Sequence, residues 1–262
     1  MTTKKEYVGN FRELIDYKKA LLFRKDIYII AKSLPSSERF IINALRKASC
    51  SICANLSEGN ASFYYAREYD HLDIAICKLA KSQALLILSF MQGYVTEEIN
   101  NRLQNNANEI VRIISALMKR IEHFQSTNVE THIDYLIKDM SFTPLENTIE
   151  RVEIFQRDIW NMVRTLPDYE VDNLVDQLNR SVNSVLQNLI KSKGVNSNRR
   201  FQELNYSLGS ISEVRAFLDI SVMEKYITLA EYRKFDEEAG LIQSVLIAQM
   251  NQLNYQLKEV KL

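Results

Sequence analysis

Apolar residues recur along this chain three or four positions apart, and short polar stretches separate one apolar run from the next. Leu72, Ile76, Leu79 and Leu86 show the pattern, because steps of four, three and seven keep their side chains on one face of a helix. The same spacing continues along the chain and predicts an all-α protein. The predicted helices cover residues 10–33, 36–57, 64–91, 97–125, 144–165, 168–192, 198–222 and 228–257.

The ends of the predicted helices coincide with residues that disfavour helix. Pro35 excludes the preceding residue from the α region, so the first helix is expected to end there. Ser36 or Ser37 is placed to cap the second helix. Gly59 and Gly93 can adopt the left-handed conformation and are expected to end the second and third helices.

One pattern occurs twice in the chain. The segment from Phe23 to Tyr28 returns 132 residues later as the segment from Phe155 to Trp160, and a Leu-Pro pair follows each. The helix-face residues return at the same offset as Leu204, Leu208, Ile211 and Leu218. We therefore predict two copies of one module, at residues 1–125 and 143–262, joined by a linker at residues 126–142.

Four helices with short connections form an antiparallel up-down bundle, so the expected fold is two tandem antiparallel up-down four-helix bundles. We expect their inner faces to hold Tyr28, Leu72, Ile76 and Leu79, with Trp160, Leu204, Leu208 and Ile211 as counterparts. Other apolar residues lie off the main stripe and favour association into a homo-oligomer. They are Phe40, Ile41, Ile42, Phe63, Tyr64 and Tyr65.

Composition narrows the class of protein. Six Gly and three Pro in 262 residues are too few for the turns of a β-rich fold. Three cysteines do not make a disulfide framework and are typical of a reducing compartment. The N-terminus is polar, and no apolar run approaches the length of a membrane span. These features predict a soluble cytoplasmic protein.

Charge is unevenly distributed between the copies. Residues 1–133 hold 18 Lys and Arg against 14 Asp and Glu, and the remainder holds 15 against 19. Copies of opposite sign can pair, within a chain or between chains. The basic residues of the first copy cluster on its first two helices and are either a solvated surface or a phosphate-contacting stripe. The candidates for nucleic-acid binding are Lys18, Lys19, Arg24, Lys25, Arg46 and Lys47.

Two spacings invite comparison with metal sites. Cys50 and Cys53 have the spacing of half a zinc site, but a structural zinc needs four ligands and no partner pair exists. Glu68 and His71 match one element of a di-iron bundle, which needs a second such element and two further Glu. Packing and solvated-surface roles explain both pairs better. We expect no metal, no cofactor and no catalytic residues, and therefore no enzyme.

Residues 46–59 of the first copy form a specific block that reads Arg-Lys-Ala-x-x-Ser-Ile-x-Ala-Asn-Leu-x-Glu-Gly. With this block, the first copy resembles the four helix bundle protein family, which includes proteins encoded in rRNA intervening sequences and accessory variability determinants of diversity-generating retroelements. The resemblance covers most of residues 10–122. It implies a four-helix bundle that assembles into a ring, five-membered in known cases, with Arg46 and Lys47 on a basic surface and with Asn55, Glu58 and Gly59 at a helix end.

In retroelement members, the resemblance also implies binding to nucleic acid and to the element's reverse transcriptase, without catalytic residues. We therefore expect a non-enzymatic oligomeric scaffold that binds DNA or RNA, a nucleic-acid-handling enzyme such as a retroelement reverse transcriptase, or both. We expect no small-molecule substrate and no membrane partner. The alternative is a protein–protein adaptor without nucleic-acid binding, which the neutral total charge favours.

Overall fold

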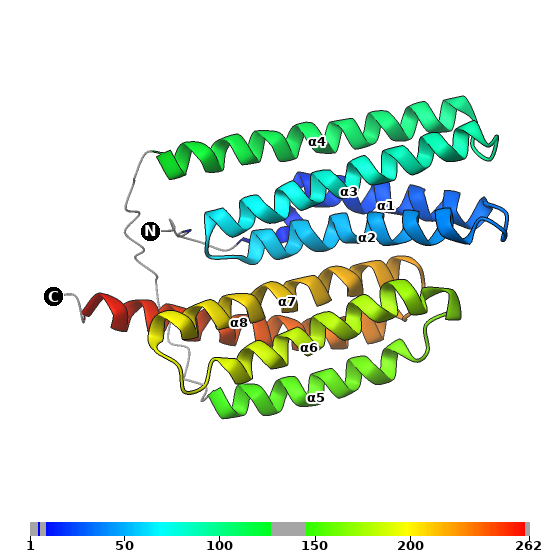
Figure 1. Ribbon diagram of the computed structural model, residues 1–262. Helices are drawn as coiled ribbons and strands as arrows, with labels where there is room; N and C mark the ends of the chain where they lie inside the picture. The colour runs from blue at the N-terminus through cyan, green and yellow to red at the C-terminus, as the bar shows by residue number, and fades with distance from the viewer. Residues whose placement is uncertain (1–4, 6–8, 127–144, 260–262) are drawn as a thin grey trace.

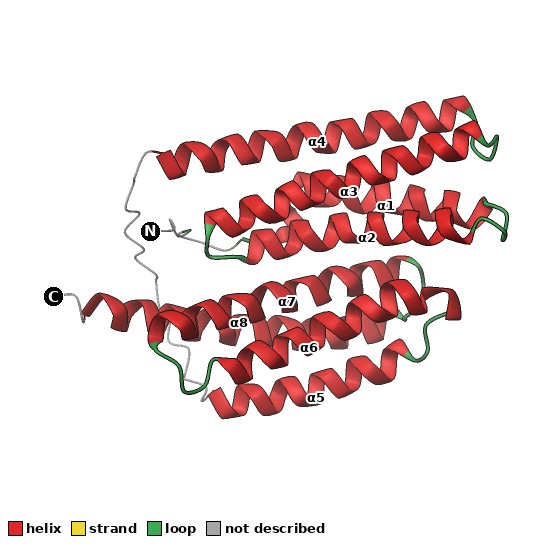
Figure 2. Cartoon of the chain, viewed as in Figure 1, coloured by secondary structure: helices red, strands yellow, loops and turns green. Residues whose placement is uncertain are grey.

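The computed structural model describes residue 5, residues 9–126 and residues 145–259, and no strand occurs among them (Figure 2). The helices of the first copy are α1 (Ile15–Ser33), α2 (Arg39–Ala61), α3 (Tyr65–Met91) and α4 (Glu97–Ser126). Those of the second copy are α5 (Leu145–Val163), α6 (Asp176–Lys191), α7 (Ser197–Met223) and α8 (Leu229–Glu259). The prediction of an all-α protein with two four-helix units is confirmed. Beyond Ser126, the predicted linker lies outside the described residues.

Each unit is an antiparallel up-down bundle (Figure 1). In the first copy, α1 packs on α2 and α4, and α3 packs on the same two helices; the second copy repeats this arrangement. In each copy, the four helices contribute side chains to a common core from equivalent repeat positions. Burying one such apolar side chain stabilises the fold by about 1.5–3 kcal/mol. One such set is Ile27, Leu45, Leu79 and Ile110, whose buried counterparts are Ile159, Leu178, Ile211 and Ile242.

The turn between the third and fourth helices is the same in both copies. Helices α3 and α7 begin 132 residues apart, and so do α4 and α8. Gly93 ends α3 with φ 74°, and Lys225 holds the equivalent position with φ 61°. The next residue donates its backbone N–H back into the helix in each copy, from Tyr94 to Ser89 and from Tyr226 to Ser221, both at 2.9 Å. The prediction that Gly93 ends the third helix is confirmed.

The repeat offset at the second helix of the two bundles is one residue larger than elsewhere. The core positions Leu45 and Leu178 are 133 apart, whereas the offset is 132 again at the start of α7. A π-helical segment, Val171–Val175, precedes α6 and takes up the extra residue, because a π turn contains one residue more than an α turn. The core register of the second copy therefore survives the insertion.

Two predictions about the ends of α2 are wrong. The helix begins after Glu38 with no side-chain cap, so neither Ser36 nor Ser37 caps it. Gly59 does not end it either, because α2 continues to Ala61. A Cβ at Gly59 would lie 2.9 Å from the Cβ of His71. This glycine therefore permits the close approach of α2 and α3 rather than a left-handed turn.

The two copies join through α2 and α7, which lie antiparallel in the middle of the molecule (Figure 1). Glu58 on α2 contacts Gly209 on α7, where a Cβ would lie 2.9 Å from the Glu58 Cγ. Phe63 is buried with its ring edge-on to Phe201, 5.9 Å between centroids. Helix α2 is the second helix of its copy and α7 is the third, so the join uses unlike faces. We call this contact the α2–α7 join.

Cations of the first copy meet carboxylates of the second across this join. Arg12 pairs with Asp219 and with Asp236, each at 2.7 Å. Buried Asp219 also accepts hydrogen bonds from the hydroxyls of Tyr17 and Tyr232, both at 2.8 Å. Against the effect of burial, Arg215 and Arg12 lower the pKa of Asp236. The opposite charges of the two copies therefore pair within the chain.

A second polar cluster of the join surrounds Glu170, which is fully buried. Its carboxylate accepts from the Tyr28 hydroxyl at 3.3 Å, from Asn173 Nδ2 at 2.7 Å and from the Tyr226 hydroxyl at 2.9 Å. In the first copy, Tyr94 makes the equivalent hydrogen bond to Glu38 at 3.0 Å. Tyr28 thus belongs to the join, because it contacts the second copy.

Trp160, the counterpart of Tyr28, is not on an inner face as predicted. It is 41 % exposed, whereas Tyr28 is 1 % exposed. The prediction fails because the other copy covers Tyr28, whereas no described residue covers Trp160 in the same way. Repeat position alone therefore does not determine burial.

Helix α3 corrects one expectation from composition. Among the described helices it is long and apolar enough to cross a membrane, judged by length and composition. Only 33 % of its most apolar window is buried, so much of that apolar surface faces outward. The expectation that no apolar run reaches this length is wrong.

Candidate nucleic-acid interface

The outer face of α1 alternates aliphatic and basic side chains. Its members are spaced three and four residues apart, so they form one row along the helix. All six are exposed, and the aliphatic members Ile15, Leu22 and Ile29 are 64 %, 62 % and 57 % exposed. We call the row Ile15, Lys18, Leu22, Lys25, Ile29 and Lys32 the α1 row.

Three of the six predicted cations are free at the surface. Lys18 and Lys25 lie in the α1 row, and Lys47 is exposed on α2. None of the three forms an ion pair with a described residue. Their charges are therefore available to a ligand. Lys32, at the end of the row, pairs with Glu224 at 2.7 Å.

Lys19 is only partly available. Its ammonium lies 2.9 Å from Glu109 on α4, and 37 % of its side chain is exposed. The pair is solvent-exposed and contributes little to stability. Lys19 points toward α4 rather than along the α1 row, so it lies beside the row instead of in it.

The prediction that Arg24 lies on the basic surface is wrong, because the second copy covers this residue completely. Its guanidinium pairs with Glu224 at 2.8 Å and lies 3.5 Å from the centre of the Tyr28 ring. Although partial burial favours the neutral acid, Lys32 and Arg24 lower the pKa of Glu224. The spacing places Arg24 on one helix face with Tyr17, Tyr28 and Ala31, but it does not show that the second copy covers that face.

Arg46 is also buried, with 6 % of its surface exposed, so it is not part of a basic surface as expected. Its guanidinium lies 4.6 Å from the Tyr169 ring of the second copy. An open groove of about 740 Å³ borders it, lined also by Lys32, Arg39, Asp168 and Asp172. Carboxylates thus face the cations of this groove.

A family model described as 23S rRNA-intervening sequence protein matches residues 12–116 and residues 147–248. The chain belongs to this family. The two matches fall on α1–α4 and α5–α8, which confirms the tandem duplication. No curated protein and no solved structure matches the chain. The family match supports a helical protein of the 23S rRNA-intervening sequence type and selects none of the six cations.

In this member of the 23S rRNA-intervening sequence family, the cysteine pair is packed in the core and Glu68 and His71 make polar contacts. Cys50 and Cys53 are fully buried, and burial raises the pKa of both thiols. Glu68 pairs with Lys5 at 2.9 Å, and His71 is 3.1 Å from Asn55. Among the described residues, no group of three or more His, Cys, Asp or Glu is arranged to hold a metal ion.

Proposed function

We propose that this protein is a non-enzymatic scaffold that binds nucleic acid through the α1 row. The observation that carries the proposal is the exposure of Lys18 and Lys25 without ion pairs to described residues. Seven residues separate them, which is about 10 Å along a helix. Ammonium groups in such a row contact backbone phosphates as point charges, and the contacts carry no sequence information.

The charge of the first copy supports the proposal. The net charge of +4 over residues 1–133 is partly used at the join, where Arg12 and Arg24 are paired with carboxylates of the second copy. Lys18 and Lys25 of the α1 row remain outside the join. Lys32 ends the row beside the groove that Arg39 lines, but its own charge is paired with Glu224 of the second copy, so Lys18 and Lys25 carry the free charge of the row.

The test is a salt titration of binding to single-stranded and duplex RNA and DNA. The variant Lys18→Glu with Lys25→Glu is expected to lose at least about tenfold in affinity and to lower the salt slope by about two. Arg157→Glu is the matched control, because Arg157 is exposed at the position of Lys25 in the second copy. No binding by the unaltered chain at low salt contradicts the proposal.

A second candidate is a protein–protein adaptor, and the exposed aliphatic residues of the same row favour it. Ile15, Leu22 and Ile29 offer apolar contacts that phosphates do not use. An acidic amphipathic helix fits alternating aliphatic and lysine side chains, and a nucleic-acid-handling enzyme is one source of such a helix. Leu22→Ser with Ile29→Ser separates the two functions, since it weakens a protein contact and leaves phosphate binding unchanged.

A further inference from the structure

A groove at one end of the molecule is built from equivalent segments of the two copies. The α1–α2 connection of the first copy and the α5–α6 connection of the second lie at the same end (Figure 1). The open groove between them has a volume of about 740 Å³, which is within the size range of small-molecule sites. We call it the inter-copy groove, and its polar lining is Arg39, Asn43, Arg46, Asp168, Tyr169 and Asp172.

Arg46 is a buried cation of this groove without a carboxylate partner. Only 6 % of its surface is exposed, its Nε has no hydrogen-bond partner, and it forms no ion pair with a described residue. Its guanidinium instead lies 4.6 Å from the centre of the Tyr169 ring and 5.6 Å from that of Tyr28. Contacts with aromatic rings recover only part of the hydration that a buried guanidinium loses. An anion bound in the groove supplies the missing partner.

The start of α2 adds positive charge to the same groove. Arg39, Asn43 and Arg46 are four and three residues apart, so they share one face of the helix. Arg39 is exposed and makes no ion pair with a described residue. The helix has no side-chain cap and no acidic residue in its first turn, because the Glu38 carboxylate bonds to the Tyr94 hydroxyl at 3.0 Å. Arginine side chains beside a helix N-terminus favour phosphate as the anion.

The opposite wall of the groove comes from the second copy and favours a ligand with one phosphate. Asp168 and Asp172 are exposed there, and their carboxylates repel a polyphosphate or a nucleic-acid strand. The same carboxylates accept hydrogen bonds from hydroxyl or amino groups. Tyr169 is 47 % exposed, so part of its ring is open to stack on a planar group.

We propose that the inter-copy groove binds a nucleoside monophosphate. Arg39 and Arg46 hold the phosphate, Tyr169 stacks on the base, and Asp168 and Asp172 accept hydrogen bonds from the ribose hydroxyls. The site needs both copies, because the first supplies the cations and the second supplies the ring and the carboxylates. The ligand is bound and not transformed, and its binding does not depend on the α1 row.

Isothermal titration of the full chain with AMP, GMP, CMP and UMP tests the site. At least one of the four is expected to bind at least about tenfold more tightly than its own nucleoside and than inorganic phosphate, because each of these lacks part of the recognised chemistry. Arg46→Met and Arg39→Ala each remove a charge-assisted contact and are expected to weaken that binding at least about tenfold.

Lys47→Ala is the matched control, since Lys47 is an exposed cation of the same helix and does not line the groove. It is expected to leave the affinity unchanged. The proposal is overturned if none of the four nucleotides binds at about 1 mM, or if Lys47→Ala weakens binding as much as the two arginine variants do.

Thermal unfolding gives a second readout. Arg46→Met replaces a cation that has no counter-ion, so without ligand it is expected to melt no lower than the unaltered chain. A lower melting temperature shows that the chain itself satisfies this cation, and it overturns the proposal. Arg39→Ala changes an exposed side chain and tests the site without altering the core.

The nucleotide that binds is expected to raise the melting temperature of the unaltered chain and of Lys18→Glu with Lys25→Glu, but not that of Arg46→Met. Loss of this shift in the α1-row variant overturns the proposal, whereas failure of nucleic acid to bind that row leaves the shift in place. A single-stranded oligonucleotide that displaces the nucleotide and depends on Arg46 also overturns the proposal, and it assigns the groove to nucleic acid.

Discussion

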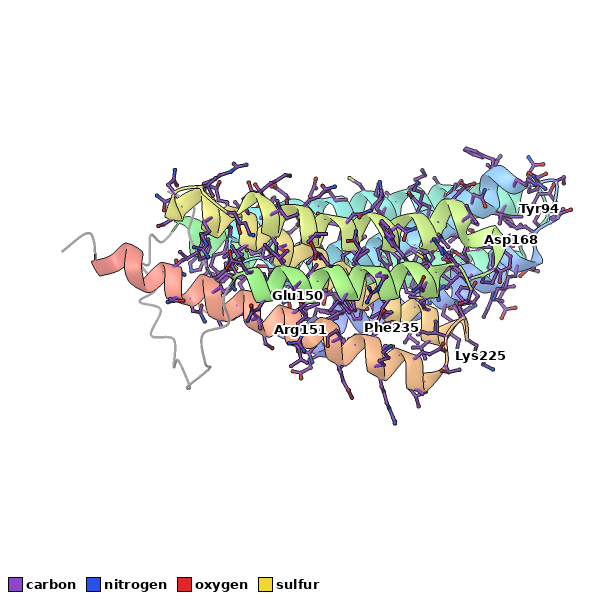
Figure 3. All side chains as sticks on the ribbon, turned by 90° about the horizontal axis from the view of Figure 1, so that it is seen from below. Tyr94, Glu150, Arg151, Asp168, Lys225 and Phe235 are labelled. Carbon is purple, nitrogen blue, oxygen red and sulfur yellow. The ribbon has the colours of Figure 1, made fainter. Side chains whose placement is uncertain are left out.

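Gly93 and Lys225 occupy one position of the same turn, and the backbone there is left-handed in both copies. Lys225 is exposed at the end of the molecule, and its side chain makes no ion pair with a described residue (Figure 3). A residue with a Cβ has a higher energy in this conformation than glycine does. The duplication thus provides a natural comparison of the two residue types at one site.

Lys225→Gly is expected to raise the free energy of unfolding by about 0.5–1 kcal/mol, because it removes the left-handed strain. Urea unfolding followed by circular dichroism measures the change. The reciprocal variant Gly93→Lys is the control and must destabilise the chain by a similar amount. Equal stability of Lys225→Gly and the unaltered chain would show that the turn carries no strain.

The exposure of single charged residues was the property hardest to predict from the sequence. Lys18, Lys25 and Lys47 are exposed, whereas Arg24 and Arg46 are buried at the join. A charged residue on a buried helix face is recognisable only when the partner that neutralises it is known. For Arg24 that partner, Glu224, lies 200 residues away in the chain. Local spacing therefore predicted the helix face but not its cover.

Among the elements, α2 and α7 are the central pair, and their close approach depends on a glycine. Gly209 has no Cβ at a point where one would lie 2.9 Å from Glu58 Cγ and 3.1 Å from its Oε1. Arg67 holds the same Glu58 carboxylate at 2.7 Å, which limits how far that side chain can move aside. The spacing of the two helices is therefore sensitive to the size of residue 209.

Gly209→Leu is expected to lower the free energy of unfolding by about 2–3 kcal/mol, because the larger side chain separates α2 from α7. Gly240→Ala is the contrasting variant. A Cβ there meets only the end of the Arg215 side chain at 3.9 Å, so the gain in helix propensity stabilises the chain by about 0.5–1 kcal/mol. Thermal unfolding of both variants checks the pair. A neutral Gly209→Leu would contradict the close approach.

At the scale of elements the sequence was most informative. The apolar spacing predicted α3 and α4 to within a residue of their observed bounds. Long amphipathic helices impose this period wherever one face is buried. The π-helical segment Val171–Val175 was not predicted, because one extra residue alters the period only locally. Gly59 was misread because a glycine required for close helix packing resembles one required for a turn.

Across the whole molecule, Asp219 connects the first copy to both α7 and α8. Arg12 donates to both of its oxygens, and the hydroxyls of Tyr17 and Tyr232 complete its shell. Removing a buried carboxylate leaves its cation with fewer partners. The resulting loss in free energy of unfolding is larger than the net contribution of the intact pair. This carboxylate therefore contributes to the stability of the two-copy unit as a whole.

Asp219→Ala is expected to lower the free energy of unfolding by about 3–5 kcal/mol, since Arg12 keeps only Asp236 as a counter-ion. Calorimetry is the measurement of choice, because it also shows whether the copies begin to unfold separately. Asp172→Ala, at an exposed position, is the control. A change below about 1 kcal/mol would mean that the join does not rely on this carboxylate.

The repeat predicted two bundles, yet their relative placement was not predictable. Identical copies suggest a symmetric pairing of like faces, whereas the chain joins α2 to α7. The choice depends on residues in which the copies differ, such as Gly209 against Cys77 and Asp219 against Ile87. Opposite net charge indicated that the copies can pair, and Arg12 and Arg24 do contact the second copy's carboxylates.

The unlike faces of the α2–α7 join also give the two copies different tolerance to substitution. Helix α2 is enclosed by α1, α3 and α7, whereas its counterpart α6 has no equivalent third neighbour among the described helices. A change in α2 must therefore satisfy three surfaces at once. In a saturation mutagenesis experiment scored by folding, α2 should accept far fewer residues than α6, although both descend from one ancestral helix.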